Sequence, residues 1–290
     1  SKEFNFPLGI FIATAYRFKI RLLKVIPMTQ WSANINVMLK AIRVAGRAMM
    51  RDFKEVDKLQ VSKKGPNDFA KRADQRAEEI LQEMLFEARP NYGFVGTGGR
   101  ETKGDDPTRR WIAQPLDGMD NFIHGLPHWS LSIALEYKGS IIASVILSPV
   151  IEELFLAEKG AGTWLNEQRV RVSGRTSLDQ MIFATNLPSG NRGNLPIHLK
   201  DIARITPSVG GVRSLGAIGL DLAYTAAGRY DGIWAHELNY WEMAAGLLLI
   251  QEAGGLCQAI TEFEDPMNSG TIIAANGEGH AKFSKLVRDK

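Results

Sequence analysis

The chain has 290 residues, of which 44% are hydrophobic and 23% are charged, so it can bury a sizeable core and has an ordinary globular composition. A single cysteine, Cys257, excludes a disulfide framework, and no apolar run reaches the roughly 18 residues that a membrane-spanning helix needs. The net charge of +3 arises in residues 1–30, where five Lys or Arg face Glu3 alone. The rest of the chain is close to neutral, which argues against a basic surface that reads nucleic acid.

Residues 1–30 are predicted to form an N-terminal apolar-basic extension. Three interpretations remain open: an arm docked on a partner protein, an element packed on the chain's own body, and an interfacial membrane helix. The scarcity of acidic residues is also typical of an organellar targeting segment. We expect protein partners, contacted through residues 1–30; contact with nucleic acid or a membrane has no further support.

From about Thr29 the pattern predicts two helices, at 32–55 and 73–86, separated by a turn at Gly65-Pro66-Asn67. Short strands then follow, separated by turn residues, as expected for an antiparallel meander. They are predicted at 111–113, 130–137, 140–147, 154–157 and 162–165.

The second half alternates predicted strands with predicted helices, which favours helices layered on sheets. The strands are predicted at 181–186, 210–213, 232–236 and 271–275, and the helices at 194–204, 219–228 and 241–253, with a final helix. We therefore divide residues 31–290 into an antiparallel-sheet half, about 31–175, and an α/β half, about 176–290.

The most informative segment runs from Gln114 to Gly125, where a predicted strand leads into a turn containing Gly118. This geometry can direct the Asp117 carboxylate and the Leu116 carbonyl at a cation, with turn amides available to a phosphate. The alternative is an ordinary strand-to-turn junction with an Asp cap.

This segment, Q-P-L-D-G-M-D-N-F-I-H-G, resembles the inositol monophosphatase signature D-P-[LI]-D-G-T-x-N-F-x-H-G. Further matches are 64–74, 220–224, 241–246 and 252–255, so the resemblance covers about residues 33–288. It implies an α+β fold, a layered αβαβα sandwich, and Mg²⁺-assisted hydrolysis of a phosphate ester.

Several positions depart from the pattern that the resemblance implies. Thr97 and Gly98 replace the two Glu of the metal loop, and Gln114 replaces the first Asp of D-P-x-D. Glu242 replaces the Asp of W-D, and Met119 replaces the Thr that shares a proton relay with the retained Asp74. Asp117, the Leu116 carbonyl and Glu242 are left as a vestigial metal set.

The substrate side is also altered. Gly118 and Asp120 stand at substrate-binding positions of the family, Ala217 replaces a hydroxyl residue, and Ala235 aligns with a substrate-binding Glu. The five histidines, His124, His128, His198, His236 and His280, show no paired metal-ligand spacing. Cys257 is expected to be buried and inert.

Two lost carboxylates, at about 3 kcal/mol each, would weaken metal binding by roughly four orders of magnitude. We therefore expect a catalytically inactive protein, not an enzyme and without a cofactor, kept as a structural or regulatory subunit of a larger assembly. A homodimer, as in the family, is an alternative assembly. We expect mitochondrial residence, with the bacterial cytoplasm as the alternative.

The alternative function is a slow Mg²⁺-dependent phosphatase acting on inositol phosphate or a related sugar phosphate. A weak, rearranged cation site would then use Asp74, Asp117, Asp120, Glu242 and Glu101, while Lys64 or Lys71 would contact the phosphate. Binding of a phosphorylated ligand without hydrolysis is a third interpretation.

Overall fold

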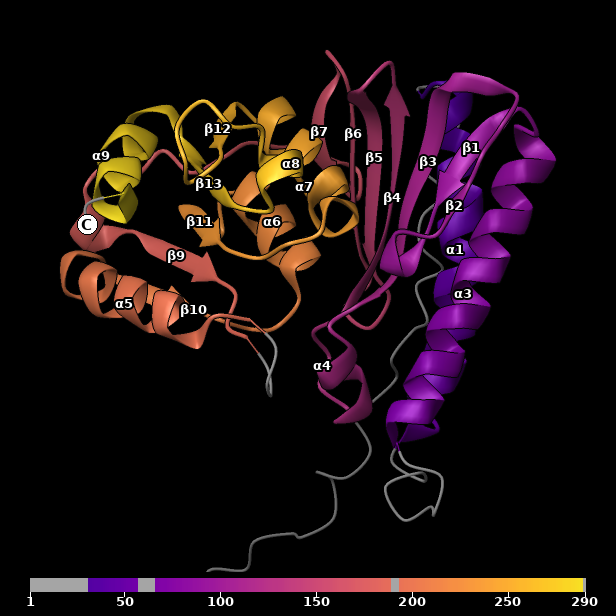
Figure 1. Ribbon diagram of the computed structural model, residues 1–290, viewed down its shortest axis with the longest axis horizontal. Coiled ribbons are helices and arrows are strands. Elements are labelled where there is room, and N and C mark those ends of the chain that lie inside the picture. Colours follow the sequence, from indigo (N-terminus) through magenta and orange to yellow (C-terminus); the bar gives the residue numbers. More distant parts are fainter. Residues whose placement is uncertain (1–30, 57–65, 189–192, 289–290) are drawn as a thin grey trace, which may run out of the picture. The chain divides into compact units, whose positions relative to one another are not determined.

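A computed structural model describes residues 31–56, 66–188 and 193–288 of the chain (Figure 1). The predicted extension over residues 1–30 lies outside the described residues, and so does Lys64. Within the described part, no helix is both long enough and apolar enough to cross a bilayer.

The first half of the described chain forms an eight-stranded sheet in the order β2-β1-β3-β4-β5-β6-β7-β8. Neighbouring strands are antiparallel, except for the parallel pair β1 and β3. The strands are β1 (Tyr92–Val95), β2 (Glu101–Thr102), β3 (Asp106–Asp117), β4 (Ser130–Tyr137), β5 (Ser140–Ser148), β6 (Glu153–Glu158), β7 (Gly162–Leu165) and β8 (Gln168–Val170). The predicted meander is confirmed, whereas the short strand predicted at 111–113 belongs to the much longer β3.

The second half forms a five-stranded sheet in the order β10-β9-β11-β13-β12. Strand β9 is parallel to β10 and β11, while β13 is antiparallel to its neighbours β11 and β12. The strands are β9 (Ile182–Thr185), β10 (Gly211–Arg213), β11 (Gly232–Ala235), β12 (Gly255–Gln258) and β13 (Ile272–Asn276).

Helices form three layers around the two sheets (Figure 1). The outer face of the large sheet carries α1 (Ala33–Phe53) and α3 (Pro66–Ala88), and α6 (Ile218–Ala226) and α7 (Tyr240–Glu252) lie between the sheets. The other face of the small sheet carries α5 (Leu195–Ile205) and α9 (Gly277–Arg288), and α4 (Met119–Ile123) and α8 (Pro266–Ser269) are short. The predicted layered αβαβα class is confirmed, while the boundary between the two halves stays a prediction.

Successive residues of the small sheet face different helical layers, because strand side chains alternate between the two faces. Ile233 packs with the apolar cluster of α6 and α7, whereas Trp234 packs on the other face against Phe283 of α9. Helix α7 is buried continuously from Met243 to Ile250, as expected for a helix enclosed by two sheets.

Gly246 lies where α7 packs on α6, and a Cβ added there would clash with the Leu222 side chain. We expect Gly246→Ala to lower the free energy of unfolding by about 1–3 kcal/mol through overpacking. Urea denaturation measures the change. Gly277→Ala is the matched control, because an added Cβ there meets nothing within 4 Å. Equal effects of the two substitutions would contradict the packing argument.

Candidate functional site

The long strand β3 delivers the signature segment to the site. Its last seven residues, ending at Asp117, are all buried. Gly118 follows with a φ of 86°, a conformation that favours glycine, and an added Cβ would lie 2.9 Å from the backbone oxygen of His128. The chain therefore turns sharply after Asp117 into α4, and only glycine fits at the turn.

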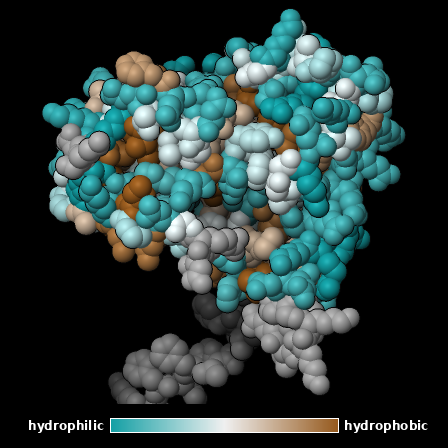
Figure 2. All heavy atoms as spheres, in the orientation of Figure 1, coloured by the Kyte–Doolittle hydropathy of each residue, from teal (hydrophilic) through white to brown (hydrophobic). Residues whose placement is uncertain are grey.

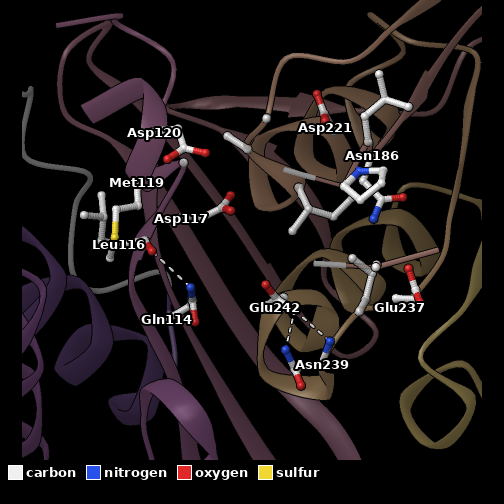
Figure 3. A pocket seen from close by; sticks show the side chains of 18 of the residues that line it. Gln114, Leu116, Asp117, Met119, Asp120, Asn186, Asp221, Glu237, Asn239 and Glu242 are labelled. Atoms are coloured by element: carbon white, nitrogen blue, oxygen red, sulfur yellow. Dashed lines mark hydrogen bonds between the residues drawn. The ribbon is translucent and has the colours of Figure 1, made fainter. Parts of the chain in front are cut away.

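A pocket of about 510 Å³ opens beside this turn (Figure 3). Its walls come from α3 and the end of β3 on one side, and from the segments around β9, α6 and α7 on the other. Six of its lining residues are carboxylic acids: Asp74, Asp117, Asp120, Asp221, Glu237 and Glu242. Among the described residues that line it, none is Lys or Arg.

Asp117 extends into the pocket from the end of β3 (Figure 3). Its Oδ2 accepts a hydrogen bond from the backbone N–H of Gly219, in the first turn of α6, over 2.7 Å. Burial raises the pKa of Asp117 to about 7; the Gly219 bond opposes this rise, and repulsion by Glu242 and Asp221 adds to it. A cation beside Asp117 would favour its charged form.

Asp74 reaches the same pocket from α3 and is only 7% exposed. Burial raises the pKa of Asp74 to about 7, and repulsion by Glu78, one helical turn further on, adds to the rise. Thr97 and Arg100 oppose it. Because the Asp74 Oδ1 atom is buried without a hydrogen-bond partner in the described structure, it is an acceptor with spare capacity.

Gln114, in place of the first signature Asp, is buried next to Leu116. Its Nε2 donates a hydrogen bond to the Leu116 carbonyl oxygen over 3.0 Å (Figure 3). Its Oε1 atom is buried and has no hydrogen-bond partner within the described residues. The side chain therefore uses one lone pair of the carbonyl predicted to face a cation, which leaves the other lone pair available, and its own amide oxygen has no partner in the part of the chain that the structure describes.

Glu242 lines the pocket but also caps α7 (Figure 3). Its Oε2 accepts hydrogen bonds from the backbone N–H of Asn239, over 2.7 Å, and from the Asn239 side chain, over 3.0 Å. This is a capping box, a common device that satisfies backbone N–H groups at a helix N-terminus. Oε2 of Glu242, a predicted metal ligand, is therefore already used in capping the helix.

The loop that replaces the two family Glu is tied to α3 by a different carboxylate. Glu78 accepts hydrogen bonds from the backbone N–H of Thr97, over 2.8 Å, and from Arg100, over 2.7 Å. Thr97 lines the pocket, whereas Gly98 is exposed and is not part of the lining. Met119 lines the pocket and has no hydroxyl to relay a proton.

On the predicted substrate side, Gly118, Asp120 and Ala217 line the pocket. Ala235 does not, because it is fully buried in β11 between the sheets. Glu237, two residues beyond the strand, does line the pocket. The alignment of Ala235 with the family's substrate-binding Glu stays a prediction, while Glu237 is the acidic residue of this segment that lines the pocket.

His198 is a second pocket residue that sequence reasoning missed, because no motif joins it to Glu237. Its ring lies 5.2 Å from that of His236, measured between centroids, but the described residues hold no group of three or more His, Cys, Asp or Glu arranged to bind a metal. Cys257 lies in β12, away from this pocket, and is partly exposed, so the prediction that it is buried is wrong; desolvation nevertheless raises the pKa of its thiol to about 12, which keeps it protonated.

The described residues contain no ready-made cluster of three ligating side chains, but the chemistry of the lining is compatible with a weakly held divalent cation. The pocket offers carboxylates, the Gln114 amide oxygen and the Leu116 carbonyl, which are the oxygen ligands that Mg²⁺ prefers. Buried, unpartnered oxygens of Asp74 and Gln114 lie among them, and a cation would satisfy such atoms. Glu101 and Lys71, which the alternative prediction included, do not line the pocket.

Without a divalent cation, the protein should lose stability as pH rises from about 4 to about 7. The pKa of Asp74 and of Asp117 is about 7 in the fold against 3.8 ordinarily, so the folded state binds more protons in this window. Asp117→Asn should remove part of the slope and stabilise the metal-free protein at pH 8 by on the order of 2 kcal/mol. Urea denaturation in EDTA at pH 5 and pH 8 tests this, with the exposed Asp105→Asn as control; identical slopes for all three proteins would contradict it.

Comparison with known proteins places this geometry in a family. The model of the inositol monophosphatase family matches residues 31–290. An inositol-1-monophosphatase from Rhizobium meliloti is 46% identical over 245 residues, covering 84% of this chain and 92% of the relative. The Nus factor SuhB of Pseudomonas aeruginosa is 40% identical over 246 residues, covering 83% and 91%. A crystal structure of the extragenic suppressor protein suhB from Bartonella henselae matches with a TM-score of 0.82 and 41% identity, covering 89% of this chain and 99% of that one. The chain therefore belongs to the inositol monophosphatase family.

These relatives contradict the prediction of a catalytically inactive structural or regulatory subunit. A protein 46% identical to this chain is named as an inositol-1-monophosphatase, which favours the alternative of a phosphatase, and family membership is compatible with Mg²⁺. The prediction counted lost charges, but Asp74, Asp117 and Glu242 still line the pocket. Mitochondrial residence is contradicted as well, because these relatives are bacterial.

Proposed function

We propose that this chain hydrolyses inositol monophosphate or a related sugar phosphate, slowly, with Mg²⁺ held at a rearranged site. The observation that carries the proposal is the pocket lined by six carboxylic acids, with Asp117 extending into it. A phosphate dianion is repelled by carboxylates unless a cation accompanies it. The named activity of the Rhizobium meliloti relative supports the same conclusion.

Asp117, the Leu116 carbonyl, the Gln114 amide oxygen and Asp74 are the groups that would hold Mg²⁺. When bound, the metal would neutralise the phosphate and lower the pKa of an attacking water. The Gly219 N–H holds Asp117 Oδ2, which fixes the orientation of this carboxylate. Burial raises the pKa of Asp74 to about 7 when no cation is present, and a bound cation would hold this carboxyl group in its charged form. Because Gln114, Thr97 and Gly98 bring no charge, we expect weak metal binding and slow turnover.

The test is the rate of phosphate release from inositol monophosphate by the full chain across a Mg²⁺ titration. The rate in EDTA is the reference without metal. A saturable rise, with half-saturation in the millimolar range, is the expected result. A version carrying Thr97→Glu, Gln114→Asp, Met119→Thr and Glu242→Asp should turn over faster at lower Mg²⁺. Phosphate release that does not depend on Mg²⁺, or none from either protein, would contradict the proposal.

Protein partners in a bacterial cytoplasm are a second proposal, favoured by the polarity of α5. This helix buries His198 and Asp201, while Leu195 and Leu199 are 48% and 52% exposed. Figure 2 shows a largely hydrophilic face with apolar residues gathered where α5 lies. Relatives named Nus factor support a role in contacts with other proteins. Loss of co-purifying proteins on Leu199→Ser, but not on Leu126→Ser, is the expected result; equal recovery with both would contradict it.

A further inference from the structure

Helix α1, on the outer face of the large sheet, carries a stripe of cations on the side opposite its buried residues (Figure 1). At 3.6 residues per turn, these side chains fall within an arc of about 80° and follow one another over about 21 Å of the helix axis. The set, called the α1 stripe below, consists of Lys40, Arg43, Arg47, Arg51 and the C-cap residue Lys54. Every residue from 40 to 54 that falls within this arc is Lys or Arg.

The α1 stripe has no ionic partner within the described residues. The ion pair that does involve α1 joins Arg76 of α3 to Asp52, which lies outside the arc. Arg43 is half-buried, and its Nε is buried without a hydrogen-bond partner in the described structure. Burial lowers the pKa of Arg43, and repulsion by Arg47 adds to the fall. An anion bound along the stripe would relieve this repulsion between like charges.

The nearly neutral net charge of residues 31–290 conceals the stripe. Glu79, Glu83 and Glu87 are exposed on α3 at intervals of four residues, so the outer surface is basic along α1 and acidic along part of α3. The two sets of charges offset one another in the sum but lie on different helices. The low net charge, which was the sequence-based argument against binding of nucleic acid, therefore does not describe the surface of α1.

A membrane and an ordinary protein interface fit this face poorly. None of the large hydrophobic residues that the described structure exposes belongs to α1. The face therefore lacks the apolar groups that insert into a bilayer or form the centre of a protein interface. A flat anionic surface would also meet the exposed glutamates of α3 and be repelled by them.

The phosphodiester backbone of a nucleic-acid duplex suits a narrow, straight stripe of cations. Its binding needs positive charge and no apolar contact, and B-DNA presents about twelve phosphates along 21 Å, at one charge per about 1.7 Å. Most of the stripe is Arg, whose planar guanidinium forms paired hydrogen bonds with phosphate. The aromatic residue of α1, Phe53, packs on Phe122 and Trp129, so this face offers no ring to stack on unpaired bases.

We propose that the α1 stripe binds the phosphodiester backbone of a nucleic-acid duplex, DNA or RNA, without reading its sequence. Arg47 and Arg51 lie near the middle of the stripe and are exposed, so both should contact phosphates. None of the stripe residues lines the pocket. The inference therefore goes beyond the proposed phosphatase function and does not depend on it.

The test is fluorescence anisotropy of labelled DNA and RNA duplexes of about 20 base pairs, titrated with the full chain from about 50 to 200 mM NaCl. Micromolar binding at the lowest salt is expected, with affinity falling steeply as salt rises. Arg47→Gln combined with Arg51→Gln should weaken binding at least about 10-fold and make the slope of log K against log[NaCl] shallower by about 2. The variant should fold, because Gln is well tolerated in an exposed helical position.

The matched control is Lys200→Gln combined with Lys285→Gln, which removes the same charge from exposed positions on α5 and α9. It should weaken binding less than about 2-fold. Binding to either duplex supports the proposal, and the ratio of the two affinities identifies the nucleic acid. Equal weakening by the two double variants would show that net charge alone matters and would overturn the assignment. Binding to anionic phospholipid vesicles but to neither duplex would overturn it as well.

Discussion

Asp117→Asn should lower Mg²⁺-dependent phosphate release from inositol monophosphate by at least about 100-fold, since losing one partner of a buried ionic contact costs about 3–5 kcal/mol. The side chain is nearly isosteric, and its amide oxygen can still accept the Gly219 N–H that Asp117 Oδ2 now accepts. The fold should therefore survive while the charge that faces the cation is lost.

Initial rates at saturating Mg²⁺ measure this loss, and a cooperative unfolding transition in EDTA, at least as stable as that of wild type, shows that the variant is folded. The control is Asp105→Asn, an exposed carboxylate outside the pocket, which should change the rate less than about 2-fold. Asp117→Asn with wild-type activity would exclude Asp117 as the principal cation ligand.

Gln114→Asp should strengthen Mg²⁺ binding by about 10–100-fold. The substitution adds a charge where the Gln114 oxygen already lies buried and unpartnered, and it removes the Nε2 donor that now occupies the Leu116 carbonyl. Without Mg²⁺ the same variant should be less stable than wild type, because a further carboxylate joins Asp117 in a buried site.

Calorimetric Mg²⁺ titration measures the affinity, and unfolding with and without Mg²⁺ measures the change in stability. Gln114→Asn is the matched control, because it shortens the side chain equally and adds no charge. If both variants bind Mg²⁺ alike, charge at this position does not limit the site.

Gly98 shows that the structure must be consulted before the two Glu of the family's metal loop are reintroduced. An added Cβ at Gly98 meets nothing within 4 Å, but the φ of 74° is unfavourable for any other L-residue. Gly98→Glu would thus carry backbone strain of about 1–2 kcal/mol, while Thr97→Glu has no such penalty, since Thr97 does not have a positive φ. A glutamate can therefore be restored at Thr97 without backbone strain, whereas restoring one at Gly98 would destabilise the fold.

Much of the fold could be predicted from periodicity. Helix α1 and the meander from β4 to β7 carry strong patterns, and their bounds lie within a few residues of the prediction. Pro66 was assigned to a turn but begins α3, since a missing N–H costs nothing in the first turn of a helix. Strand β1, Tyr92–Val95, was missed because four residues that include a glycine give no period.

The site was only partly predictable, for a physical reason. Asp117, Leu116 and Asp74 lie in or near contiguous motifs, so their convergence could be expected. Glu237 could not be chosen over Ala235, because the choice depends on where β11 ends, and strand ends are set by pairing with β13 and β9. His198 required the packing of α5 beside that strand end, which leaves no trace in local sequence.

The single hydrogen bond from Gly219 to Asp117 makes one backbone amide a spectroscopic reporter of the site. A carboxylate polarises an N–H bond more strongly than a carboxylic acid does, so the amide resonance of Gly219 should move with the charge of Asp117. Protonation and metal occupancy could then be followed by NMR at one glycine peak, without substrate and without turnover.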